Sequence, residues 1–117
     1  MEIRTEEVIP PDEAPFNRLN AAVGVYQNTV YIYGGECASS SRAYDDLWSY
    51  RADLNSWKKI DFFAKKEAKP GKLIGAQFHA VRGGLYLFGG YIFDTADLPL
   101  WFLNPHLDPV TFTKETG

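Results

Sequence analysis

The feature that most constrains this chain is an internal repeat. Residues 15–35 align without gaps over residues 70–90, and each copy ends in a pair of glycines, Gly34-Gly35 and Gly89-Gly90. Repeats with periods of roughly 20 to 50 residues are typical of solenoids and propellers. We therefore expect two similar structural units and not one irregular domain.

Each unit contains four segments that we expect to form short strands. In the first unit they are Asn20–Tyr26, Thr29–Tyr33, Asp46–Arg51 and Ser56–Ile60; in the second they are Ala76–Val81, Leu85–Phe88, Leu100–Asn104 and Thr111–Lys114. Gln27-Asn28 and Arg82-Gly83-Gly84 stand where a tight hairpin needs residues that accept a positive φ. The second strand of each unit is apolar at nearly every position, which indicates a strand covered on both faces.

Composition agrees with an all-β protein of many short strands. The 117 residues are 45% hydrophobic and 15% aromatic, with ten glycines and seven prolines. Such a chain can bury a real core, and aromatic residues and turn formers favour strands over long helices. The net charge of −3 offers no general attraction for nucleic acid, so nucleic acid is not an expected partner.

The chain also lacks the usual signs of secretion, membrane insertion and metal binding. Its one cysteine, Cys37, excludes an internal disulfide framework and a cysteine-based zinc cluster. No basic and apolar leader and no membrane-length apolar run is present, so we expect a cytoplasmic protein, with the nucleus not excluded. His79 and His106 have no ligand spacing between them, and we expect no metal and no cofactor.

The repeat resembles the kelch motif. In the first unit Arg18, Gly34, Gly35, Trp48, Tyr50 and Trp57 occupy the motif's positions; in the second, Gly89, Gly90 and Trp101 are retained, while Leu73, Leu103 and Phe112 replace the arginine, tyrosine and tryptophan. The resemblance implies an all-β fold of two four-stranded antiparallel blades from an incomplete β-propeller. An unrelated small β-sandwich or barrel is the alternative. The expected division is an N-terminal segment over 1–14, repeats over 15–61 and 74–117, and an inter-blade loop over 62–73.

The signature residues have physical roles that do not depend on the family. A diglycine permits backbone conformations closed to residues with a Cβ, and leaves room for an aromatic ring against the chain. We expect Tyr50 or Trp57 to supply that ring. Burying a tryptophan removes a large apolar area from water, so Trp57 is expected to dominate the stability of the first blade.

Two blades are too few to close a ring. Propellers typically have four to eight blades, and each blade packs its faces against two neighbours. Standing alone, two blades would expose an apolar face at each end. The remaining blades come either from a longer propeller or a separate subunit, or from further copies of this chain. The segment Met1 to Val8 is a candidate outer strand of a preceding blade.

Long loops on one edge of the blades are the expected binding surface. In a four-stranded antiparallel blade the loops after the second and fourth strands emerge together, which groups Glu36–Tyr44, Asp61–Leu73 and Tyr91–Leu98. The candidate partner-binding residues there are Arg42, Tyr44, Lys65, Lys66, Lys69, Tyr91 and Phe93. The lysines would meet an acidic partner or simply keep the protein soluble, and the aromatic residues would bind a partner or pack on a next blade.

We therefore expect a protein that binds an unidentified protein partner and is not an enzyme. The alternative is a segment of a propeller enzyme that resembles galactose oxidase, whose copper chemistry needs tyrosine and histidine ligands around a special cysteine. These two units do not supply that set. The acidic pair Asp45-Asp46 is expected to cap a turn and bond to backbone amides.

Overall fold

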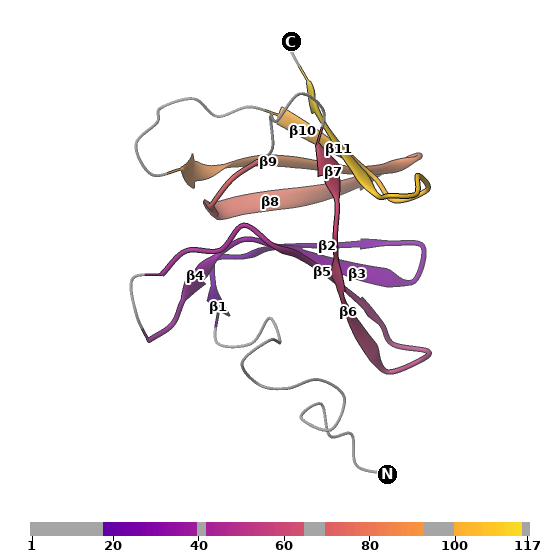
Figure 1. Ribbon diagram of the computed structural model, residues 1–117, viewed down its shortest axis with the longest axis horizontal. Coiled ribbons are helices and arrows are strands. Elements are labelled where there is room, and N and C mark those ends of the chain that lie inside the picture. The colour runs from indigo at the N-terminus through magenta and orange to yellow at the C-terminus, as the bar shows by residue number, and fades with distance from the viewer. Residues whose placement is uncertain (1–17, 40–41, 65–69, 93–99, 116–117) are drawn as a thin grey trace.

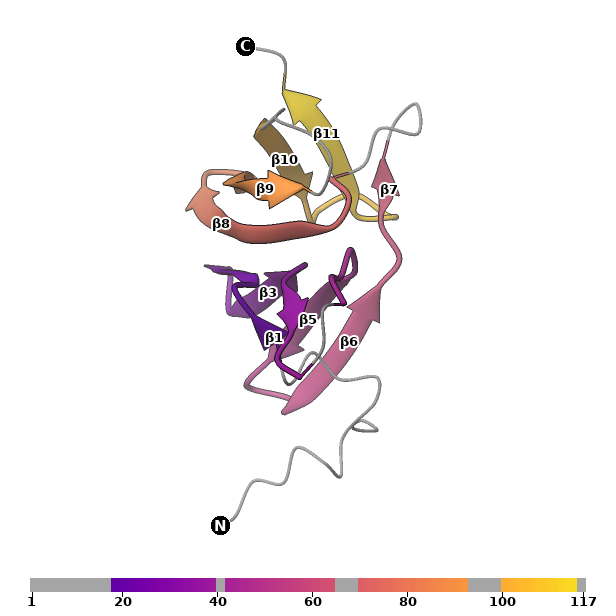
Figure 2. The ribbon, with the colours of Figure 1, turned by 90° about the vertical axis from the view of Figure 1, so that its left-hand side faces the viewer.

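A computed structural model describes residues 18–39, 42–64, 70–92 and 100–115, and all regular structure in these ranges is β-strand (Figure 1). The strands form two larger sheets that stack on each other, and a small sheet of two two-residue strands lies beside the first (Figure 2). The expectation of an all-β fold is confirmed.

The first sheet, called blade 1 below, is a four-stranded antiparallel meander. Its strands are β2 (Ala22–Tyr26), β3 (Thr29–Tyr33), β5 (Leu47–Arg51) and β6 (Ser56–Ile60), which are neighbours in that order. The small pair consists of β1 (Arg18–Leu19) and β4 (Glu36–Cys37), in the same register as β2 and β3. The four expected strands of this unit are therefore present, and the first begins two residues later than expected.

The second sheet, called blade 2 below, has the same meander and one strand more. Its strands are β8 (Leu73–Val81), β9 (Gly84–Ile92), β10 (Leu100–Asn104), β11 (Thr111–Glu115) and β7 (Phe63–Ala64). The short β7 pairs in parallel with β11 at the sheet edge. The inter-blade loop thus contains a strand, and blade 2 has five strands where four were expected.

The hairpin of β8 and β9 is longer than the sequence pattern indicated. Leu73 pairs with Ile92 and Ile74 pairs with Tyr91, so β9 continues past the diglycine. Tyr91 therefore belongs to a strand and not to the loop in which we expected it. The cause is the first strand, which starts at Leu73 and so gives these residues a pairing partner.

The diglycines are needed for their backbone conformation. Gly34, Gly35, Gly89 and Gly90 all have a positive φ, between 71° and 93°. This region is closed to most residues with a Cβ. The diglycine in blade 1 also allows a close approach between the two blades, because the Gly35 N–H donates to the Leu73 carbonyl at 2.8 Å and a Cβ on Gly34 would lie 2.6 Å from that oxygen.

The atoms beside the diglycine differ from those we expected. The nearest neighbours of a Cβ at Gly34 or Gly35 are backbone atoms and Ala21, not the ring of Tyr50 or Trp57. Those two rings pack on each other, with centroids 4.7 Å apart. The reason is position, since Tyr50 pairs with Trp57 in β6 and with Val30 near the start of β3, at the opposite end of that strand from the glycines.

The hydrophobic core lies between the two sheets. Blade 1 contributes Ala22, Tyr31, Tyr33 and Leu47, and blade 2 contributes Ala76, Leu85, Leu87, Trp101, Leu103 and Phe112. Phe112 is fully buried and packs edge-on against Tyr33, with ring centroids 5.5 Å apart. The core is therefore shared, and neither sheet has a core of its own.

Only one face of each second strand is covered, contrary to the expectation of a strand buried on both faces. In β9, Leu85 and Leu87 are fully buried, whereas Phe88 is 40% exposed. In β3, Tyr31 and Tyr33 are buried and Val30 and Ile32 are only partly buried, while Val23 and Val25, which pair with Ile32 and Val30 from β2, are 56% and 58% exposed. The exposed side chains point away from the shared core, because successive side chains of a strand alternate between faces. Each blade therefore has an inner face and an uncovered outer face.

Gly24 sets how closely the two blades pack. A Cβ at this position would lie 2.6 Å from the Phe78 Cβ and 2.8 Å from the Leu85 Cδ2. Because Phe78 Cβ is bound to the backbone, it cannot turn aside, and the added methyl must separate the sheets. We expect Gly24→Ala to lower the free energy of unfolding by about 1–3 kcal/mol, the usual cost of overpacking a core.

Urea denaturation followed by circular dichroism measures this loss. Lys58→Ala in β6 is the control, because Lys58 is exposed and the substitution adds no atoms to the interface. A Gly24→Ala protein as stable as wild type would mean that the sheets do not pack as closely in solution.

Candidate functional site

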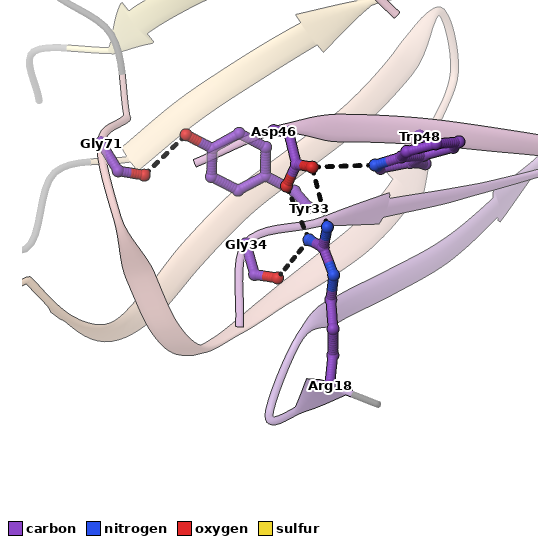
Figure 3. A network of polar contacts seen from close by, with 6 residues as sticks. All are labelled: Arg18, Tyr33, Gly34, Asp46, Trp48 and Gly71. Carbon is purple, nitrogen blue, oxygen red and sulfur yellow. Dashed lines mark hydrogen bonds and ion pairs between the residues drawn. The ribbon is translucent and has the colours of Figure 1, made fainter. Parts of the chain in front are cut away.

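A buried ion pair lies at the end of the blade 1 strands where Gly34 and Gly35 follow β3 (Figure 3). This end of the blades is called the diglycine edge below. The Arg18 guanidinium donates to both carboxylate oxygens of Asp46, at 2.6 and 2.7 Å, and to the Gly34 carbonyl at 3.0 Å. Trp48 Nε1 donates to Asp46 Oδ2 at 2.9 Å. One carboxylate therefore ties together the diglycine, the start of β5 and the arginine before β2.

This network is shielded from water. The side chains of Arg18 and Asp46 are 5% and 19% exposed. Burial by itself would raise the pKa of Asp46, but the hydrogen bonds from Arg18 and Trp48 outweigh it and hold that pKa below its usual value. Asp46 was expected to bond to backbone amides; it interacts with its own backbone amide and also accepts from two side chains, Arg18 and Trp48.

A second contact joins this edge to blade 2. The Tyr33 O–H donates to the Gly71 carbonyl at 2.6 Å, just before β8 (Figure 3). Burial, together with the nearby carboxylates of Asp45 and Asp46, strongly raises the pKa of Tyr33. Tyr33 is therefore a neutral hydrogen-bond donor at all physiological pH values, and its role is to fix the edge.

Tyr44 and Arg42, two of the expected partner-binding residues, lie together on this edge. The Arg18 guanidinium carbon is 3.8 Å from the centroid of the Tyr44 ring, and that of Arg42 is 5.1 Å from it. Such cation–π contacts favour a fixed orientation of the ring. Tyr44 is half-buried and belongs to the framework of the edge, whereas the Arg42 side chain is exposed.

The structure adds an acidic cleft that the sequence did not indicate. It has a volume of about 500 Å³ and is lined by Asp45, Asp46, Lys59, Ile60, Asp61, Phe62 and Ala64. Asp45 and Asp61 are exposed, and they come from the segments before β5 and after β6. The folded blade brings these carboxylates together. The one signal in the sequence was the expected hairpin of β5 and β6, because a hairpin places the segments before its first strand and after its second strand at the same end.

Blade 2 lacks the ion pair. The positions equivalent to Arg18 and Asp46 are held by Leu73 and Pro99, so both charges are replaced by apolar residues. Leu73 is 4% exposed. Trp101, the equivalent of Trp48, keeps a buried Nε1 with no hydrogen-bond partner among the described residues. Losing both charges together avoids a buried unpaired ion, at the expense of one unsatisfied indole N–H.

The remaining expected site residues divide by whether the structure describes them. Lys65, Lys66, Lys69 and Phe93 lie outside the described residues, as does the segment Met1 to Val8. Tyr91 is placed in β9 opposite Ile74. Trp48 and Trp101, which were expected to be structural, are each 3% exposed. Trp57 is only half-buried, because it lies on the outer face of blade 1.

Histidine and cysteine have ordinary surroundings. His106 Nε2 and the Tyr26 hydroxyl share a hydrogen bond of 2.7 Å, which links the β10–β11 turn to blade 1. Cys37 Sγ lies 3.5 Å from the Ser39 hydroxyl oxygen. Within the described ranges there is no group of three or more histidine, cysteine or acidic residues that could hold a metal ion.

The two stacked antiparallel meanders, with positive-φ diglycines directly after β3 in blade 1 and within β9 in blade 2, are consistent with two blades of a repeat-built propeller. Residues 17–61, which span blade 1, match the family model of the kelch motif. No curated protein matches the chain. In the described parts of the chain, no helix has the length and apolar character needed to cross a membrane.

Proposed function

We propose that the chain is a protein-binding module whose two kelch blades form part of a larger propeller. The observation that carries this proposal is the exposure of apolar side chains on both outer faces of the stack. Val23 and Val25 are more than half exposed on blade 1, and Phe88 and Leu100 are 40% and 38% exposed on blade 2. Exposed apolar surfaces of this kind typically mark contacts with other proteins.

We further propose that the diglycine edge holds the partner protein, without catalysis. Arg42 is exposed beside the Tyr44 ring, and the cleft lined by Asp45 and Asp61 begins one residue after Tyr44 along the chain. The buried pair of Arg18 and Asp46 holds the backbone beneath them in one conformation. A rigid base that carries exposed charges of both signs favours specific recognition, because a partner must match both signs.

A comparison of two arginine substitutions tests the binding edge. The chain is immobilised, and the proteins that it retains are identified and their affinity is measured. Arg42→Glu is expected to weaken the main complex at least tenfold, or about 1.4 kcal/mol, the effect of losing an interface anchor. Arg82→Glu is the matched control, because Arg82 is exposed in the β8–β9 turn at the opposite edge.

Retention of the partner by Arg82→Glu and its loss from Arg42→Glu would support the proposal. Equal binding by both variants would place the interface elsewhere. A chain that retains no protein at all would contradict the proposed function.

A further inference from the structure

We propose that the outer face of blade 2 docks on the outer face of blade 1 of a second copy of this chain, head to tail, and that the copies close into a ring. The inference rests on the proposed function, since it names what completes the propeller. Outer face 1 is defined by Val23, Val25, Val30, Ile32 and Trp57, and outer face 2 by Gln77, His79, Tyr86, Phe88 and Phe102.

These two faces are the repeat counterparts of the two surfaces that already meet inside the chain. The alignment of Pro15 with Pro70 carries Gly24 and Tyr31, on the inner face of blade 1, onto His79 and Tyr86. The strand register agrees, because Gly24 pairs with Tyr31 and His79 pairs with Tyr86. Outer face 2 is therefore the counterpart of the surface with which blade 1 receives blade 2.

The same shift relates the other two surfaces. Val23 and Val30, on outer face 1, correspond to Phe78 and Leu85, which point into the shared core. Outer face 1 is thus the counterpart of the surface that blade 2 presents to blade 1. Docking two copies head to tail repeats the geometry of the contact between blades, seen where β8 lies over β2 in Figure 1.

The backbone at the edge of blade 2 is shaped for this contact. In blade 1, Gly34 lies against the Leu73 carbonyl of the next blade, at 2.6 Å from an added Cβ. Its counterpart Gly89 has a similar backbone conformation, with φ values of 71° at Gly34 and 80° at Gly89, yet a Cβ at Gly89 would meet none of the described residues within 4 Å. The space that a neighbouring blade occupies at Gly34 is therefore not filled at Gly89 by any residue that the structure describes.

The backbone hydrogen bonds between blades have counterparts as well. Gly35 N–H donates to the Leu73 carbonyl, and Gly75 N–H donates to the Asn20 carbonyl at 2.9 Å. In the docked pair, Gly90 N–H of one copy would donate to the Arg18 carbonyl of the next, and Asn20 N–H of the next to the Gly75 carbonyl. Asn20 has a φ of 60°, close to the 80° of Gly75, so its backbone already has the required shape.

Side-chain size points to a copy of this chain and not to another kelch blade. Inside the chain, Gly24 has no side chain and receives the large Phe78 and Leu85. Between copies, the receiving position is His79, and the entering residues are Val23 and Val30. Both sets contain about the same number of side-chain heavy atoms, and volume-conserving exchanges are the ones that interfaces tolerate. A blade with Phe and Leu at the entering positions would collide with His79.

The aromatic contact follows the same rule. Tyr33 packs on Phe112 inside the chain, with centroids 5.5 Å apart. The counterpart between copies is Phe88 on Trp57, and both of these side chains are partly exposed in the single chain. Docking would therefore bury the ring of Trp57. Since propellers close with four to eight blades, a ring of two-blade chains has two to four copies.

Two blocked variants test the arrangement, and each is measured by light scattering after size-exclusion chromatography. The wild-type chain is expected at two to four times its monomer mass of 13.2 kDa. Val23→Glu blocks outer face 1 and Phe88→Glu blocks outer face 2, so each alone is expected at 13.2 kDa. Mixed together they retain one intact pair of faces and are expected to form a dimer of twice that mass.

Leu54→Glu is the control, because Leu54 is 62% exposed in the β5–β6 turn and lies on neither face. This variant is expected to assemble like wild type.

The inference is overturned by a monomeric wild-type chain, by a single blocked variant that still assembles, or by a mixture that does not associate. Far-UV circular dichroism confirms that each variant is folded, and the substituted side chains, Val23 and Phe88, are already 56% and 40% exposed. A monomer that still binds a partner through Arg42 would remove this inference and leave the proposed function standing.

Discussion

Phe112→Ala is expected to lower the free energy of unfolding by about 3–5 kcal/mol, the range observed when a buried phenylalanine is removed. Phe112 is fully buried in β11, and its ring meets those of Tyr33, Phe62 and Trp101 with centroids 5.0 to 6.4 Å apart. Removing it leaves a cavity where both blades and the link between them meet. A stability of 5–15 kcal/mol is typical of a small domain, so the loss is a large part of the total.

Phe63→Ala is the matched control for this prediction. Phe63 lies in β7, next to Phe62, but it is 51% exposed, and the same atoms are deleted. Urea titrations of the two variants should differ clearly in midpoint. Similar losses from both would show that the core does not lie between the sheets.

Asp46→Asn is expected to cost about 3–5 kcal/mol at neutral pH, because it leaves the buried Arg18 without its counter-charge. The cost should depend on pH. The pKa of Asp46 is lowered in the folded protein, so the carboxylate stabilises the fold above the unfolded pKa of about 4, and this contribution is lost as the pH falls through the lower, folded value. The difference in stability between wild type and variant should therefore shrink below about pH 4.

Asp53→Asn provides the comparison. Asp53 pairs with Arg51 at 2.6 Å, the same distance as in the buried pair, but both side chains are about half exposed. Exposed pairs contribute little, so this variant should unfold at nearly the wild-type urea concentration. A difference between Asp46→Asn and wild type that stays constant from pH 7 to pH 3 would contradict a role for the carboxylate charge.

The sequence was sufficient for the repeat, the all-β class and most strands. Strands that pair within one hairpin can be predicted from the local sequence pattern. The predicted ranges Ser56–Ile60 and Leu100–Asn104 match the observed strands at both ends. The strand β7 could not be predicted, because two residues carry no periodicity and their pairing depends on where β11 lies. The ion pair of Arg18 and Asp46 joins positions 28 residues apart and needed the fold.

The relative burial of aromatic residues was not predictable either. Trp57 and Phe112 occupy equivalent positions in the repeat, and the sequence suggested that Trp57 would contribute most. The structure buries Phe112 fully and Trp57 only partly. The repeat determines which face of its sheet a side chain occupies, but whether that face is covered depends on a neighbouring sheet. In the candidate site, Arg42 was proposed as a partner-binding residue from its residue type and its loop. The cleft at Asp45 and Asp61 could be recognised only in the structure.

The shared core has a consequence for synthesis of the chain on the ribosome. Tyr33 is made early, but the side chain that covers it, Phe112, is made about 80 residues later, or several seconds at ordinary rates of translation. Blade 1 emerges with its apolar inner face open to the cell for that whole interval. Slowing translation downstream of β6 should therefore prolong the exposure and increase the fraction of nascent chains that is captured by chaperones or lost to aggregation.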